Sequence, residues 1–165
     1  MNDEPGFAGD EERMEISGRQ AWQMAIQELL RDPGAEISMY SADFSDWPLN
    51  QPDVISALDA WGHTRRMPCV RILARRFDIV QRDFARFARW RTRFGHIIVC
   101  HALPEELAAP QECLLLSERG IVALPSDTFR RGLWCSGVRL HTATGLFEQA
   151  WQLSEPGFPA QTLGL

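Results

Sequence analysis

The chain has 165 residues, of which 45% are hydrophobic and 24% are charged, and its formal net charge is −5. This length predicts one domain, and no apolar run approaches the roughly 20 residues that a membrane-spanning helix requires. All 17 basic residues are arginine, so mechanisms that need a lysine, such as Schiff-base chemistry or a P-loop, are excluded.

The start of the chain differs from the rest in composition. Residues 1–14 are rich in acidic residues, glycine and proline, which is typical of disorder. Residues 1–15 carry the whole net charge of −5, and they do not resemble a secretion signal. We therefore expect a cytoplasmic protein with a disordered acidic tail over 1–14, a neutral domain over 15–157 and a C-terminal tail over 158–165.

The first elements of the domain are predicted from residues that typically begin or end a helix. Ser17 can serve as the N-cap of a first helix that continues to about Arg31, before an Asp-Pro-Gly stop. Residues 37–44 then alternate loosely between apolar and polar side chains, which predicts a strand. After a loop with two prolines, Asp53 can cap a second helix.

Residues 69–101 form the clearest unit, a strand, a crossover helix and a parallel strand. The apolar runs 69–74 and 96–101 are too short for typical helices and suit strands buried on both faces. Parallel strands need a crossover of a dozen or more residues, which 75–94 supplies. Its apolar residues share one helical face: Phe77, Val80, Phe84, Phe87 and Phe94.

The last third of the domain predicts a hairpin, a further strand and a helix. Residues 113–117 and 121–124 are apolar strands joined by a tight turn, and one more strand is expected within 125–141. A final helix is expected to start at Thr142 or Thr144. The sequence thus predicts an α/β fold with a mixed, mostly parallel sheet and helices on both faces.

Arginines gather in the central unit. Residues 71–93 contain eight arginines and two aspartates, a local charge of +6. Several of these arginines recur on the helix face opposite the phenylalanines. Such a face can contact a phosphate backbone while a tryptophan stacks on a base. An acidic protein partner, the acidic tail or water alone are the alternative contacts. The candidate ligand-binding residues are Arg82, Arg86, Arg89, Arg93 and Trp90.

Histidine and cysteine give only a weak catalytic signal. The four cysteines form no CxxC pair, which favours buried thiols, so we expect no metal site and no cofactor. A residual catalytic site would require at least two of His101, Cys113 and His141 to meet in one cleft with an arginine. The first two of these can meet if they lie on neighbouring strands.

Two segments resemble parts of one phospholipase D-like half. Residues 113–126 resemble the strand that carries the His-x-Lys-x4-Asp motif together with its return strand, and Phe147-Glu148-Gln149-Ala150-Trp151 resembles the closing helix. In that register the motif positions hold Gln111, Cys113 and Glu118. The resemblance covers roughly 35–155. The chain is also similar to an uncharacterised proteobacterial family found alone or appended to N-acetyltransferases.

The resemblance implies a fold and the loss of an activity. In the superfamily the motif histidine is the nucleophile and the lysine neutralises the phosphoryl oxygens. Because both are missing, it implies a degenerate, non-catalytic domain that acts as a binding or regulatory module for a phosphate-bearing ligand or an acidic protein partner. Full enzymes combine two halves, which implies a homodimer here. The alternative is a phosphodiester hydrolase or transferase with a residual His/Cys site.

Overall fold

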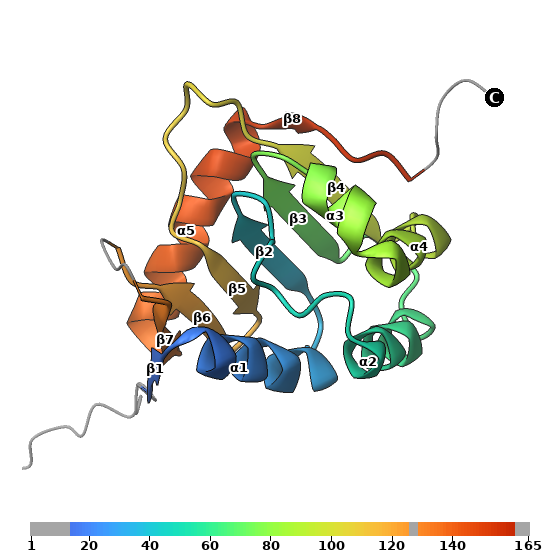
Figure 1. Cartoon of the computed structure of the whole chain (residues 1–165). Coiled ribbons are helices and arrows are strands. Elements are labelled where there is room, and N and C mark those ends of the chain that lie inside the picture. The colour runs from blue at the N-terminus through green and yellow to red at the C-terminus, as the bar shows by residue number, and fades with distance from the viewer. Residues whose placement is uncertain (1–13, 126–128, 161–165) are drawn as a thin grey trace, which may run out of the picture.

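The computed structural model describes residues 14–125 and 129–160, so the predicted tail lies outside the described residues except for Met14. These residues form one eight-stranded sheet with α5 on one face and α1–α4 on the other (Figure 1). The strands are β1 (Met14–Ser17), β2 (Ile37–Ser41), β3 (Val70–Ala74), β4 (Ile98–Ala102), β5 (Cys113–Leu116), β6 (Gly120–Ala123), β7 (Arg131–Cys135) and β8 (Glu155–Pro156). The helices are α1 (Arg19–Arg31), α2 (Pro52–Gly62), α3 (Asp78–Asp83), α4 (Ala85–Arg93) and α5 (Gly137–Leu153).

The strand order is β1-β7-β6-β5-β2-β3-β4-β8. The mixed sheet and the helices on both faces are confirmed, but parallel pairing is confined to β2, β3 and β4 among the described strands. The other neighbours are antiparallel, so the sheet is less parallel than the sequence predicts. The connections between the strands explain this difference. Helical crossovers follow β2 and β3, whereas β5, β6 and β7 are joined by short turns and loops.

The central unit has the predicted parallel strands. β3 and β4 pair in register from Val70↔Ile98 to Ala74↔Ala102. The crossover is not one helix, however. It breaks at Phe84, whose φ of −112° and ψ of 62° end α3 before α4 begins. Both short helices still pack their apolar side chains on the sheet.

The chain enters the domain through a strand that the sequence analysis missed. β1 pairs antiparallel with β7, and the predicted N-cap Ser17 is its last residue. Gly18 precedes α1 instead, with a φ of +95° that glycine adopts without steric strain. The second helix begins one residue before the expected cap Asp53, with Pro52 in its first turn.

The C-terminal part completes the sheet and covers its second face. The predicted hairpin is present as β5 and β6, and the further strand is β7. α5 starts at Gly137, directly after β7, rather than at Thr142 or Thr144. Beyond α5 the chain runs along β4 as β8, and Phe158 stacks on Phe77 with ring centroids 5.3 Å apart.

Candidate functional site

The three positions that resemble the phospholipase D motif lie before β5, on β5 and in the turn after it. Gln111 is exposed just before β5, and Glu118 is exposed in the turn between β5 and β6. Cys113 is only 1% exposed, and burial raises the pKa of its thiol to about 12. A protonated, enclosed thiol cannot replace a cation, and a glutamine amide is neither a nucleophile nor a base.

A cavity of about 260 Å³ remains beside these positions, between β6, β7 and α5. Its polar lining consists of Gln111, Arg139 and Thr142, with Cys135 and aliphatic side chains around them. Phosphodiester cleavage needs an activated nucleophile and a group that moves the proton. The described lining supplies one guanidinium and no carboxylate or imidazole that could act as a base.

The residual His/Cys pair does not form. Cys113, Tyr40, Leu73 and His101 lie in one row across β5, β2, β3 and β4. The expectation that Cys113 and His101 are on neighbouring strands is therefore wrong, because two strands separate them. Three inter-strand spacings place their Cα atoms roughly 14 Å apart, beyond hydrogen-bond reach.

His141 is also remote from His101. It is exposed on α5, ten residues before Trp151, which corresponds to about 15 Å along a helix. His101 stacks on the Trp151 ring with centroids 3.9 Å apart, and its Nδ1 lies 2.8 Å from the Ser154 hydroxyl. Burial lowers the pKa of His101. Stacking and burial describe a packing residue rather than a general base.

The arginine face predicted on the crossover is present on α3 and α4. Arg82, Arg86, Arg89 and Arg93 are all exposed. Arg82 is paired with Asp83, and Arg93 is paired with Asp59. The Arg86 guanidinium donates one long hydrogen bond, of 3.4 Å, to the backbone carbonyl of Asn50. In the described part of the chain, no carboxylate pairs with Arg86 or Arg89, so these two are the cations available to a ligand.

The prediction that Trp90 stacks on a base is wrong. Trp90 is 2% exposed and packs between Phe87 and Phe94, with ring centroids 5.5 and 6.1 Å apart. Its ring belongs to the core between α4 and the sheet, so no base can stack on it. The ligand face of α4 is therefore composed of arginines without an aromatic platform.

Other arginines of the same stretch stabilise the fold. Arg91 is 6% exposed and donates hydrogen bonds to the carbonyls of Ile98 and Phe158. Arg75 donates to two carbonyls in the loop between β4 and β5. Arg71 pairs with Glu148 at 2.5 Å beneath α5. The local charge of +6 therefore overstates the positive field at the surface.

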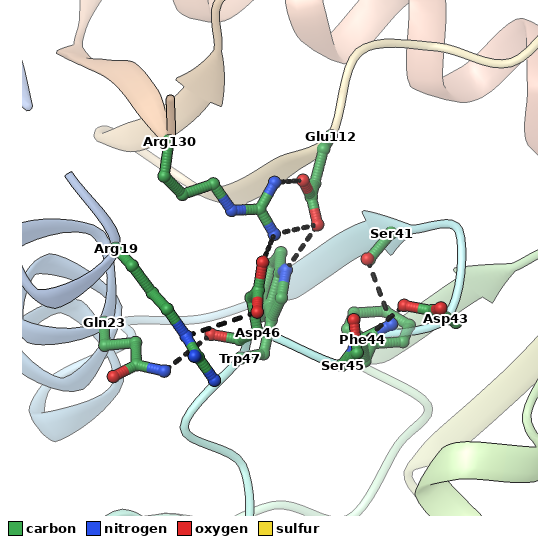
Figure 2. Close-up of polar contacts among 10 residues, drawn as sticks. All are labelled: Arg19, Gln23, Ser41, Asp43, Phe44, Ser45, Asp46, Trp47, Glu112 and Arg130. Carbon is green, nitrogen blue, oxygen red and sulfur yellow. Dashed lines mark hydrogen bonds and ion pairs between the residues drawn. The ribbon is translucent and has the colours of Figure 1, made fainter. Parts of the chain in front are cut away.

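A polar network that the sequence analysis missed lies where the loops after β2 and before β5 and β7 meet (Figure 2). Glu112 accepts a hydrogen bond from Trp47 Nε1 at 2.8 Å. It also accepts hydrogen bonds from the two terminal guanidinium nitrogens of Arg130. Asp46 lies 3.5 Å from the same guanidinium and 3.3 Å from Arg19 Nε. The network joins four segments that are distant in sequence.

The loop that carries Trp47 and Asp46 is held in a strained conformation. Phe44 has a φ of +61°, which is uncommon for a residue other than glycine. Its backbone N–H donates to Ser41 Oγ at 3.0 Å, and its buried ring meets Trp47 edge-on at 4.9 Å. This packing fixes the loop and so places the side chains of Asp46 and Trp47.

The topology defines a phospholipase D-like fold. Nuc from Salmonella typhimurium, a phospholipase D family member, is similar with a TM-score of 0.59 and 9% identity, over 88% of this chain and 99% of Nuc. NucT from Helicobacter pylori is similar with a TM-score of 0.54 and 5% identity, over 90% of this chain and all of NucT. TrmBL2, an archaeal chromatin protein, is similar with a TM-score of 0.64 and 19% identity, over 90% of this chain and 56% of TrmBL2.

Residues 18–163 match the family model described as Domain of unknown function (DUF7931), and the chain belongs to that family. No curated protein sequence matches the chain. In 14–125 and 129–160, no helix is long and apolar enough to cross a membrane. The same residues contain no group of three or more His, Cys, Asp or Glu side chains placed to hold a metal ion.

Proposed function

We propose that this protein is a non-catalytic phospholipase D-like module that binds a phosphate-bearing ligand through α4, with a nucleic-acid backbone as the main candidate. The observation that carries this proposal is the exposed pair Arg86 and Arg89, which no described carboxylate neutralises. TrmBL2, which has a similar fold, is described as showing a novel mode of DNA binding. That likeness concerns the fold, and the arginines supply the chemical argument.

The residues at the positions that resemble the motif support binding without cleavage. Gln111 and the enclosed Cys113 supply neither nucleophile nor cation. Two strands separate His101 from Cys113, and most of α5 separates it from the exposed His141. The proposal of a phosphodiester hydrolase or transferase with a residual site therefore has no geometric support.

Exchanging both available arginines for glutamine, as Arg86→Gln/Arg89→Gln, is expected to weaken binding to a labelled single-stranded oligonucleotide by at least about tenfold at low salt. Fluorescence anisotropy measures this with DNA and RNA probes over a salt titration. The slope of log K against log salt should become shallower by about 1.4, because each lost phosphate contact on a single strand removes about 0.7.

The matched control is Arg31→Gln/Arg66→Gln, which removes the same charge from exposed positions outside the α4 face. It should leave both the affinity and the salt slope close to those of the original protein. Equal weakening in both double variants would show a general charge effect and reject the α4 surface. Absence of binding at low salt by the unmodified protein would reject nucleic acid as the ligand.

An acidic protein partner is the second candidate for the same face. Two arginines there, Arg82 and Arg93, already pair with the carboxylates of Asp83 and Asp59, so the face accommodates carboxylate geometry. A partner that co-purifies after nuclease treatment and is lost in Arg86→Gln/Arg89→Gln would favour this reading over nucleic acid.

We infer that this chain, which corresponds to one phospholipase D-like half, forms a homodimer in which the two copies contact each other through α5. The outward side of α5 carries three exposed apolar residues, Val138, Leu146 and Leu153, at 71%, 45% and 61% exposure. Their spacing of eight and seven residues places them on one side of a helix. Analytical ultracentrifugation should give twice the monomer mass, and Leu146→Glu should shift it to the monomer. A monomer before mutation contradicts the inference.

A further inference from the structure

The outer edge of β1 presents backbone groups that no other described strand binds. β1 is the last strand of the sheet on its side and lies beside the start of α1 (Figure 1). Gly18 N–H donates to the Arg130 carbonyl, which makes these two residues a hydrogen-bonded pair that continues the β1–β7 ladder. Such pairs recur at every second residue of an antiparallel ladder, so Glu15 and Ser17 direct their N–H and C=O groups outward.

An apolar groove of about 440 Å³ runs beside this edge, between β1, α1 and the ring of Trp134 on β7. Met14 and Met24 on its walls are 58% and 61% exposed. The α1 residues that line it, from Ala21 to Arg31, span about 15 Å along the helix. That length matches about four or five residues of an extended strand. The apolar lining consists of Met14, Ile16, Ala21, Met24, Ala25 and Trp134.

An open edge next to an apolar groove fits an extended peptide. When a strand is added to a sheet, main-chain hydrogen bonds supply affinity and adjacent pockets receive alternate side chains. Met14 and Ile16 lie two residues apart and both line the groove. Every second side chain of an added strand therefore faces the same groove. β1 contains no proline that would block such pairing.

The charges around the groove favour a basic partner. Glu15 and Glu28 line it and are exposed, and within the described ranges no ion pair involves either carboxylate. Arg31 is the one cation of the lining. Three consecutive acidic residues, 10–12, also precede β1 closely in the sequence. A second copy of β1 would bring the same carboxylates to this edge, so like charges oppose pairing between two copies.

We propose that the edge of β1 and its groove bind an extended, basic segment of another protein, with apolar residues at alternate positions. The backbone groups of Glu15 and Ser17 pair with the segment, and the groove between Met24 and Trp134 receives its apolar side chains. Lysine or arginine next to the apolar positions meets the carboxylates of the rim. The surface is separate from the α4 face and from α5, and it does not rest on the functions proposed for them.

Fluorescence anisotropy with the labelled peptide KVTVTVK tests this surface. Its acidic counterpart EVTVTVE should bind at least about tenfold more weakly. With the valines in the groove, the threonine N–H groups face β1 in an antiparallel arrangement and the valine N–H groups face it in a parallel one. Methylating the backbone nitrogens of one of these two sets should therefore weaken binding at least about tenfold. No binding of KVTVTVK at low salt, or unchanged binding of both methylated peptides, would overturn the proposal.

Variants of the full chain locate the binding surface. Ser17→Pro removes an outward N–H, which an edge strand tolerates, and should weaken KVTVTVK binding at least about tenfold. Met24→Gln should weaken it about threefold or more, because an exposed apolar wall of the groove is lost. Met67→Gln is the matched control, since Met67 is 75% exposed outside the groove, and it should bind like the unmodified protein.

The variants also distinguish a peptide from a second copy. Circular dichroism establishes that Ser17→Pro is folded, and Met24→Gln retains the test if it is not. Equal binding by Met24→Gln and Met67→Gln would overturn the proposal. Analytical ultracentrifugation should give the same mass for Ser17→Pro and the unmodified protein. A lower mass for Ser17→Pro would assign the edge to a second copy and would also overturn it.

Discussion

Replacing Glu112 with alanine is expected to lower the free energy of unfolding by about 3 kcal/mol. The Glu112 side chain is 15% exposed and accepts hydrogen bonds from Trp47 and from two nitrogens of Arg130. Without it, the buried indole N–H of Trp47 loses its acceptor, and the Arg130 guanidinium keeps only the longer contact with Asp46. Urea denaturation at neutral pH measures the change from the transition midpoint.

Two comparison variants separate the network from a loss of surface charge. Glu106→Ala removes an exposed carboxylate and should change stability by less than about 0.5 kcal/mol. Glu112→Gln keeps an acceptor for Trp47 but loses the ion pair with Arg130, so its stability should lie between the other two. If Glu112→Ala were as stable as Glu106→Ala, the network would contribute nothing to the fold.

The same network connects the start of α1 to the loops that precede β5 and β7. Glu112 holds Arg130 from the start of β5, while Asp46 connects that guanidinium to Arg19 at the start of α1. The strained loop at Phe44 sets the position of Asp46. The carboxylates therefore orient Arg19 and Arg130, and the position of both arginines depends on the packing of a loop far from them in sequence.

The central strand, crossover and strand could be predicted because their signals are local. Short apolar runs, helical spacing of phenylalanines and a crossover of sufficient length all lie within residues 69–101. The hairpin of β5 and β6 was equally accessible, because its turn residues stand between two apolar runs. These elements carry their own pattern, so distant parts of the chain did not need to be known.

Long-range pairing could not be read in the same way. β1 and β8 have four and two residues, too few for a periodic signal, and each pairs with a strand far away in sequence. The insertion of β5 beside β2 is equally non-local, and it is what separates Cys113 from His101. The Glu112 network has the same cause, since its members come together only when that order is known.

The error at Trp90 was avoidable, however. Phe87, Trp90 and Phe94 are spaced by three and four residues, so they share one helical stripe. Arg91 follows Phe87 by four residues and falls on the same buried side. Composition made both residues look like parts of a basic surface, whereas their spacing placed them against the sheet. Periodicity deserved more weight than residue type in this helix.

Replacing Arg91 with alanine is expected to lower the free energy of unfolding by about 3 kcal/mol. Arg91 is 6% exposed, and the carbonyls of Ile98 and Phe158 accept hydrogen bonds from its guanidinium at 3.0 and 3.2 Å. The alanine variant leaves both carbonyls without this donor and removes the stem that packs beside them. Urea denaturation measures the loss.

Arg89→Ala is the matched control, since it changes the same residue type on the same helix at an exposed position. It should alter stability by less than about 0.5 kcal/mol while weakening oligonucleotide binding. Limited proteolysis adds a local readout, because Arg91 joins α4 to the segment after α5 and its loss should expose that segment to cleavage. Equal stability of the two variants would mean that desolvation of the buried charge offsets its hydrogen bonds.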